Sequence, residues 1–173
     1  YTINELFDLD HTLAAEYLSQ FTYPWEALAG MKDFIIRLGE SLPKDEYTEI
    51  SEHVWVANSA KVFPSAYLGE AVIVGKDAQV RHCAFVRGSA LVGEGAVVGN
   101  SIELKNVILF DKVEVPHYNY VGDSVLGNRS HLGAGVICAN LRLDKGNVII
   151  TLPEGRINSN MRKLGAMLAD EAE

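Results

Sequence analysis

The chain has 173 residues, of which 48% are hydrophobic and 22% charged, and its formal net charge at pH 7 is −8. This length suits one globular domain, and the acidic balance argues against binding to the phosphates of nucleic acids. No apolar run approaches the ~18 residues of a membrane span and no signal peptide is evident, so we expect a soluble, cytoplasmic protein without nucleic-acid or membrane partners.

Residues 1–46 have the pattern of a helical segment. Thr2 and Glu5 form a T-x-x-E capping box, and Pro24 suits the first turn of a later helix. The apolar residues of that later helix recur at steps of three and four, which predicts one buried face: Leu28, Met31, Ile35, Leu38 and Leu42. A polar linker over residues 43–46 ends the segment.

From residue 54 the chain repeats every six residues, and we assign residues 47–173 to a second domain. Each hexad carries one aliphatic residue: Val56, Val62, Leu68, Val74, Val80, Val86, Val92, Val98 and Leu104. The position two before it is mostly alanine or valine. In a three-residue strand the first and third side chains point to the same side, so the aliphatic residue and the residue two before it both face inward. Three such strands and three corners then form a triangular coil of eighteen residues. Such coils stack into a parallel β-helix, whereas a β-sandwich would have freer spacing.

The six-residue spacing between interior aliphatic residues shortens to five residues at two places. Leu109 follows the interior Leu104 by five residues, and Leu126 follows the interior Val121 by five. A shortened corner changes the direction of the next side chains, and a local irregularity in a rigid scaffold is where a site can form. The two cysteines have no metal-type spacing, so we interpret Cys83 and Cys138 as free thiols in a reducing compartment.

The period breaks after Asn140 and returns near the end. Residues 144–160 predict a hairpin excursion, because two strand-like runs flank the turn sequence Pro-Glu-Gly. Ala166 and Leu168 then resume the repeat. The sequence stops in the middle of a hexad at Glu173, which would leave an open strand edge. We therefore expect the native chain to continue beyond this residue.

Two cations occupy equivalent places on adjacent coils. Arg87 follows the interior Val86, and Lys105 follows the interior Leu104, eighteen residues later. Neighbouring cations repel each other unless an anion joins them, and phosphate suits such a pair. A pair of solvated charges without a ligand is the alternative. Glu103 projects outward from the strand just before Lys105.

His117 lies at a corner, two residues beyond the interior Val115. Pro116 fixes the backbone immediately before it. A rigidly placed, accessible imidazole suits a general base near neutral pH. The alternative is a structural or merely exposed histidine, which is the commoner role of a lone histidine.

A family resemblance covers residues 85–140, and its most specific stretch is VGNSIELKNVILFDKVEVPHYNYVGDSVLGNRSHLGAGVICAN. This stretch resembles the acetyltransferase domain of the bifunctional enzymes that combine glucosamine-1-phosphate N-acetyltransferase with UDP-N-acetylglucosamine pyrophosphorylase. Archaeal sugar-1-phosphate nucleotidylyltransferases are similar too. Residues 1–50 lack the glycine-rich nucleotide loop of a pyrophosphorylase, so the chain is identified as a stand-alone relative.

The resemblance implies a left-handed β-helix, a homotrimer with sites between subunits, and acetyl-CoA as acyl donor without a required metal. It implies that His117 is the catalytic base. The other matched positions are the sugar-phosphate ligands Arg87 and Lys105, the catalytic or substrate-binding Glu103, Tyr120 and Asn140, and Ala134 at the acetyl-CoA site.

Two substitutions distinguish this sequence from the bacterial members of that family. His131, which we include among the substrate-binding residues, stands where those enzymes carry Asn, and Leu141 stands where they carry Tyr. Both positions concern sugar recognition, so a different sugar is an open alternative. Most of the coenzyme A contacts of the family would lie beyond Glu173.

We therefore expect an acyl-CoA-dependent N-acetyltransferase that acts on an amino-sugar 1-phosphate, such as glucosamine-1-phosphate, in UDP-N-acetylglucosamine synthesis. The alternative is a non-catalytic trimer that binds sugar phosphates or nucleotide sugars. A zinc hydratase of similar fold would need three convergent histidines, and His82, His117 and His131 are too scattered for that. We expect no metal site.

Overall fold

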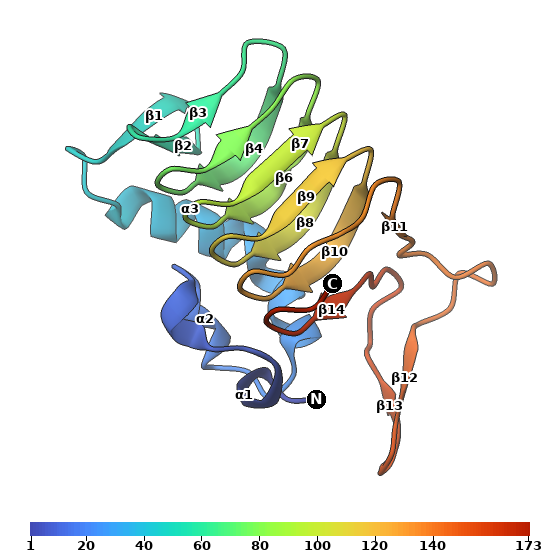
Figure 1. The fold of residues 1–173 in the computed structure, drawn as a ribbon. Helices are drawn as coiled ribbons and strands as arrows, with labels where there is room; N and C mark the ends of the chain where they lie inside the picture. The colour runs from blue at the N-terminus through green and yellow to red at the C-terminus, as the bar shows by residue number, and fades with distance from the viewer.

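The computed structural model describes residues 1–173, and the hexads form a parallel β-helix whose coils stack along one axis (Figure 1). This confirms the predicted fold class. One sheet contains β2 (Val54–Ala57), β4 (Tyr67–Val74), β6 (Phe85–Val92), β8 (Glu103–Leu109), β10 (Tyr120–Leu126), β11 (Ile137–Cys138) and β14 (Met167–Leu168). A second contains β3 (Lys61–Val62), β5 (Gln79–Val80), β7 (Val97–Asn100) and β9 (Glu114–His117). An unforeseen strand, β1 (Tyr47–Ser51), pairs antiparallel with β2.

The long strands bend, so each covers two of the three faces of the coil. Face 1 carries their first residues, such as 85–87 and 103–105; face 2 carries their last, such as 90–92 and 107–109; face 3 is the second sheet. Each corner from Ala71 to Gly135 holds a residue in the left-handed region, where Asn and Asp are better tolerated than most residues. At the corner between faces 1 and 2, here the 1–2 corner, these are His53, Ala71, Ser89, Asn106 and Asp123. At the corner between faces 3 and 1, the 3–1 corner, they are Cys83, Ser101, Tyr118 and Gly135.

The interior contains the aliphatic residues that the period of six predicts. From Val74 onward they are fully or almost fully buried, whereas Val56, Val62 and Leu68 are half-buried because they belong to the first coil. Both cysteines are free; Cys138 lies on the interior row, and burial raises the pKa of its thiol.

Both five-residue steps fall at the 1–2 corner. Val86 pairs with Leu104, eighteen residues on, but Val92 pairs with Leu109, seventeen residues on. The next coil is also seventeen residues long, because Leu109 pairs with Leu126. One corner residue is therefore missing beside Lys105, and another is missing beside Asp123. The shortened corners lie a full face away from His117.

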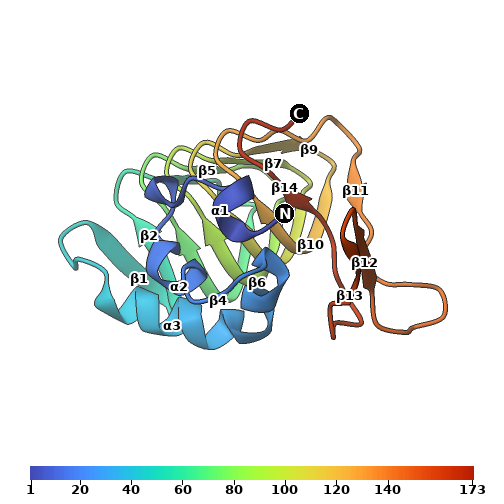
Figure 2. The ribbon, with the colours of Figure 1, turned by 90° about the horizontal axis from the view of Figure 1, so that it is seen from below.

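Face 2 is covered by the N-terminal segment (Figure 2). Its outward side chains are apolar and buried: Trp55, Ile73, Leu91, Ile108 and Val125. The covering elements are α1 (Ile3–Leu6), η1 (Leu9–His11), α2 (Ala15–Leu18), η2 (Pro24–Gly30) and α3 (Met31–Ser41). The single helix expected after Pro24 is thus two, a 3-10 segment and an α-helix that meet at Gly30. None of these helices has the length and apolarity to cross a lipid bilayer.

The helical segment also contacts the last coil. The backbone N–H of Asp170 donates to the carbonyl of Leu6 at 3.0 Å, and the carboxylate of Asp170 accepts from the N–H of Asp8 at 2.6 Å. Its other oxygen accepts from the N–H of Asn128 at 2.7 Å. Helices and coils share one hydrophobic cluster, so the segment is part of the folded body.

The predicted excursion is a hairpin of β12 (Ile149–Leu152) and β13 (Gly155–Asn158), which projects from the end of the stack (Figures 1 and 2). The chain then returns to the coils, where Met167 pairs with Val125 and Leu168 with Leu126. The resumed repeat at Ala166 and Leu168 is therefore confirmed.

The contact between face 2 and the helices predicts a difference between matched truncations. Leu91→Ala removes a fully buried side chain beneath the helices and should lower the free energy of unfolding by about 2–5 kcal/mol. Val97→Ala truncates the equivalent outward position on face 3, which is half-buried, and should cost below about 1 kcal/mol. Urea unfolding measures both values. Equal costs would contradict the helical cover on face 2.

Candidate functional site

The outer surface of face 1 carries two rows of side chains, one residue per coil. The row nearer the 3–1 corner contains Tyr67, Phe85, Glu103, Tyr120 and Ile137. The second row, nearer the 1–2 corner, contains Arg87 and Lys105 and then Gly122, which pairs with Lys105. Because Val86 pairs with Leu104, the two cations lie on adjacent coils, as the spacing predicts.

Each cation has a carboxylate partner. Arg87 Nη1 lies 2.9 Å from Glu103 Oε1, and Lys105 Nζ lies 2.9 Å from Asp123 Oδ1. The sequence analysis, which considered only the spacing of the two cations, did not foresee these carboxylate partners. Any phosphate would bind cations that the protein already positions and partly neutralises.

Asp123 connects several of the predicted residues. Its side chain is 3% exposed. Oδ1 accepts from Lys105 Nζ and from Asn106 Nδ2, at 2.9 and 2.8 Å, while Oδ2 accepts from Asn140 Nδ2 at 2.6 Å. Asn140 Nδ2 also donates to the Tyr120 hydroxyl at 3.1 Å. Asp123 is the site residue that sequence reasoning missed; the second five-residue step was the only indication of it.

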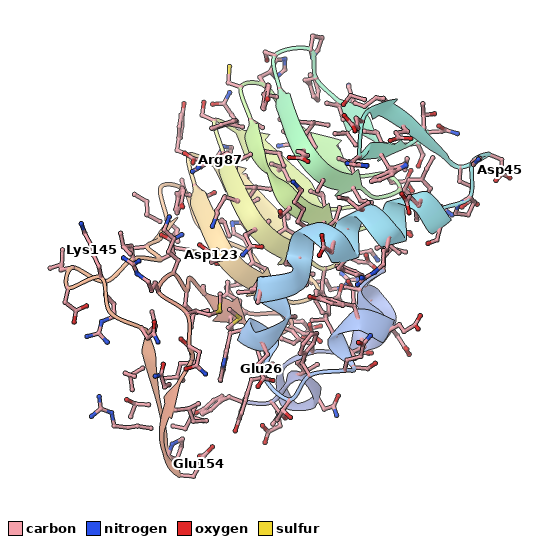
Figure 3. The ribbon with its side chains drawn as sticks, turned by 180° about the vertical axis from the view of Figure 1, so that it is seen from behind. Glu26, Asp45, Arg87, Asp123, Lys145 and Glu154 are labelled. Carbon is pink, nitrogen blue, oxygen red and sulfur yellow. The ribbon has the colours of Figure 1, made fainter.

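These contacts position the Lys105 side chain and leave some of its ammonium N–H groups available. A buried carboxylate is costly unless charges and hydrogen bonds compensate it, and here three donors do so. Lys105 uses one of its three ammonium N–H groups on Asp123 Oδ1. The remaining N–H groups can bind an anion on the outer surface of face 1. Arg87 and Asp123 lie on the same side of the coils, beside the helical segment (Figure 3).

His117 and Ala134 are exposed at the 3–1 corner, on successive coils. Asn119 fixes the backbone there from an interior position. Its Oδ1 accepts from the N–H of His117 at 3.2 Å, and its Nδ2 donates to the carbonyls of Gly133 and Val136. The corner is therefore rigid, while no hydrogen bond holds the imidazole of His117.

One copy of the chain does not bring all eight predicted site residues together. Five gather on face 1 or at its 1–2 corner: Arg87, Glu103, Lys105, Tyr120 and Asn140. His117 pairs with Asn100 at the 3–1 corner, whereas Lys105 lies towards the 1–2 corner, so the two residues lie at opposite edges of face 1. His131 lies on face 3, with Nδ1 3.5 Å from Glu114 Oε2.

Comparison with known proteins found relatives by sequence. The chain is 31% identical over 156 residues to the bifunctional protein GlmU of Methanococcus maripaludis strain S2, which covers 89% of this chain and 38% of the relative. It is 41% identical over 68 residues to the bifunctional sugar-1-phosphate nucleotidylyltransferase/acetyltransferase of Sulfurisphaera tokodaii, covering 39% of this chain and 17% of the relative. No family model matches. The chain thus spans well under half of these curated relatives.

A search of solved structures found a partial likeness to the acetyltransferase domain of PglB from Neisseria gonorrhoeae FA1090 in complex with acetyl coenzyme A. The TM-score is 0.49 at 20% identity, over 51% of this chain and 44% of that one. The sequence relatives confirm the resemblance that residues 85–140 indicate.

The contacts of Asp123 predict that its replacement by the almost isosteric Asn lowers the free energy of unfolding measurably. Asn tolerates the left-handed corner, but Asp123→Asn replaces one accepting oxygen with a donor that faces other donors. We expect a loss of about 1–3 kcal/mol in the free energy of unfolding. Glu103→Gln changes the exposed pair with Arg87 and should cost below about 1 kcal/mol. Equal losses, measured by urea unfolding, would show that Asp123 is no more important than a surface carboxylate.

Proposed function

This chain is a sequence relative of the bifunctional GlmU proteins, and we propose that it is an acyl-CoA-dependent N-acetyltransferase of the hexapeptide-repeat type. Its substrate is an amino sugar with a phosphate on the anomeric carbon, as in glucosamine-1-phosphate, in UDP-N-acetylglucosamine synthesis in the cytoplasm. The observation that carries this proposal is the rigid group of Lys105, Asp123, Asn140 and Tyr120 beside Arg87.

The phosphate binds to Arg87 and Lys105. A guanidinium and an ammonium on adjacent coils, ~4.8 Å apart, can contact different oxygens of one phosphate. Glu103 and Asp123 keep both side chains in place before the substrate arrives. Tyr120 and Asn140 supply polar atoms next to that position, where sugar hydroxyls can be bound.

The chemical step is attack of the sugar amine on the thioester of acetyl-CoA. His117 removes a proton from the ammonium or from the attacking amine. The C–N bond forms, the C–S bond breaks, and the protonated His117 returns its proton to the thiolate, so that coenzyme A leaves as its thiol. Backbone N–H groups at the 3–1 corner, next to Ala134, are available to stabilise the oxyanion. This step requires no metal.

A second copy of the chain completes the site. Within one copy, His117 and Lys105 lie at opposite edges of face 1. Exposed apolar side chains lie along the 3–1 corner, beside His117: Tyr67, Phe85, Tyr118, Val136 and Ile137. Contiguous exposed apolar residues mark interaction surfaces. A homotrimer of cyclic symmetry would place the 3–1 corner of each copy against face 1 of the next.

Acetyl transfer to glucosamine-1-phosphate by the natural full-length protein tests the role of His117. His117→Ala should lower kcat by about 10²–10⁴-fold, because a general base is lost. His82→Ala is the control. His82 lies in the same column of the 3–1 corner, and its ring centroid lies 4.3 Å from that of Phe63 in a tilted arrangement. The substitution should change kcat less than about twofold. Unchanged activity of His117→Ala would remove His117 from the mechanism, and tight binding without turnover by the wild type would indicate the non-catalytic alternative.

Mixed oligomers test whether two copies share a site. His117→Ala and Lys105→Met should each be nearly inactive alone. In a refolded 1:1 mixture, about a quarter of the sites would combine an intact His117 of one copy with an intact Lys105 of its neighbour. Recovery of about a quarter of the wild-type rate is expected. No recovery in mixtures shown to contain both variants would place both residues in the site of one copy.

A further inference from the structure

Asn119 is a buried polar residue in an interior row that is apolar in the preceding coils. The row lies at the 3–1 corner, two positions before the interior aliphatic residues, and the preceding coils place Ala66, Ala84 and Ile102 there. Asn119 is only 2% exposed, and a buried amide is costly unless its polar atoms are hydrogen-bonded. The amide stands in the coil that carries His117, so its position calls for a reason beyond packing.

The β-helix does not require an amide at this corner. In an earlier coil Ala84 occupies the same position, and its N–H closes the corner by donating to the carbonyl of Arg81 at 3.3 Å. The corner of the coil after Asn119 is closed by the same bond, from the N–H of Val136 to the carbonyl of Gly133 at 3.3 Å. The contacts of the amide are therefore an addition to the bonds that form the corner.

The amide joins two groups that the acetyl transfer needs at a fixed separation. Its Oδ1 accepts from the N–H of His117 at 3.2 Å, and its Nδ2 donates to the carbonyl of Gly133 at 2.8 Å. The carbonyl and the N–H of one trans peptide point in opposite directions, so the N–H of Ala134 is directed away from the interior. That N–H has no hydrogen-bond partner within the chain and lies at an exposed corner.

We propose that Asn119 is a positioning residue for acetyl transfer. It holds the backbone of His117 in one coil and the outward N–H of Ala134 in the next, and so sets the distance between the general base and the oxyanion donor. This inference rests on the proposed function and adds a residue that touches neither the sugar nor coenzyme A. A displacement on the order of 1 Å at either group would slow the chemical step, because reacting groups must be held in near-ideal geometry.

Acetyl transfer to glucosamine-1-phosphate by the natural full-length protein, measured with two variants of Asn119, tests this role. Asn119→Ala introduces the residue that earlier coils carry, and Asn119→Leu restores the side-chain volume without any hydrogen bond. Both should lower kcat at least about tenfold. The KM for glucosamine-1-phosphate should change less than about twofold, because Arg87 and Lys105 lie towards the 1–2 corner.

Asp170→Ala is the control for lost stability. It removes the hydrogen bonds that the carboxylate accepts from the N–H groups of Asp8 and Asn128, at 2.6 and 2.7 Å, at the corner between faces 2 and 3. This variant should lower the midpoint of urea unfolding at least as much as Asn119→Leu, but it should change kcat less than about twofold.

The inference is overturned if Asn119→Leu recovers the wild-type kcat, which would make packing the role of Asn119. It is also overturned if the loss appears in KM rather than in kcat, or if Asp170→Ala lowers kcat to the same extent. The proposed function fails separately. A wild-type protein that transfers no acetyl group removes the activity, and the role of Asn119 with it. An active wild type whose Asn119 variants are equally active keeps the activity and removes this role alone.

Discussion

At the 1–2 corner, the buried carboxylate of Asp123 accepts hydrogen bonds from Lys105, Asn106 and Asn140. The rest of the candidate site depends on this interaction. Lys105 comes from one coil, Asp123 from the next, and Asn140 from the one after, so the carboxylate fixes three coils relative to one another. A buried charge with complete compensation is rigid, because loss of any partner leaves an expensive unpaired group.

The three faces of the β-helix have different roles. Face 2 is sealed by helices and stabilises the fold through apolar contact. Face 1 presents charged side chains towards the 1–2 corner and a mixed row with exposed apolar residues towards the 3–1 corner, on a backbone that the interior aliphatic rows hold in register. The 3–1 corner is exposed, apolar and next to His117. A second copy is best accommodated there, since docking on face 2 would require displacement of α3 and η2.

Much of the architecture could be predicted from the period of six, because the interior rows of a triangular coil repeat with it. The helical cover left a weaker signal in the sequence: the outward residue of face 2 is apolar in every coil, as at Ile73, Leu91 and Ile108, whereas the outward residues of the other two faces are mixed. Asp123 could not be predicted. Its role arises from a shortened corner and from Asn140, which reaches back from the following coil. The carboxylate partners of Arg87 and Lys105 depend on side-chain directions that residue spacing alone does not specify.

A crystal structure of the full-length protein with an amino-sugar phosphate and coenzyme A would test the central claim most directly. The account predicts that the anomeric phosphate contacts Arg87 and Lys105, that Lys105 keeps its contact with Asp123, and that the amine faces His117 of a second copy. A phosphate bound away from Lys105, or an amine that faces His117 of the same copy, would contradict it.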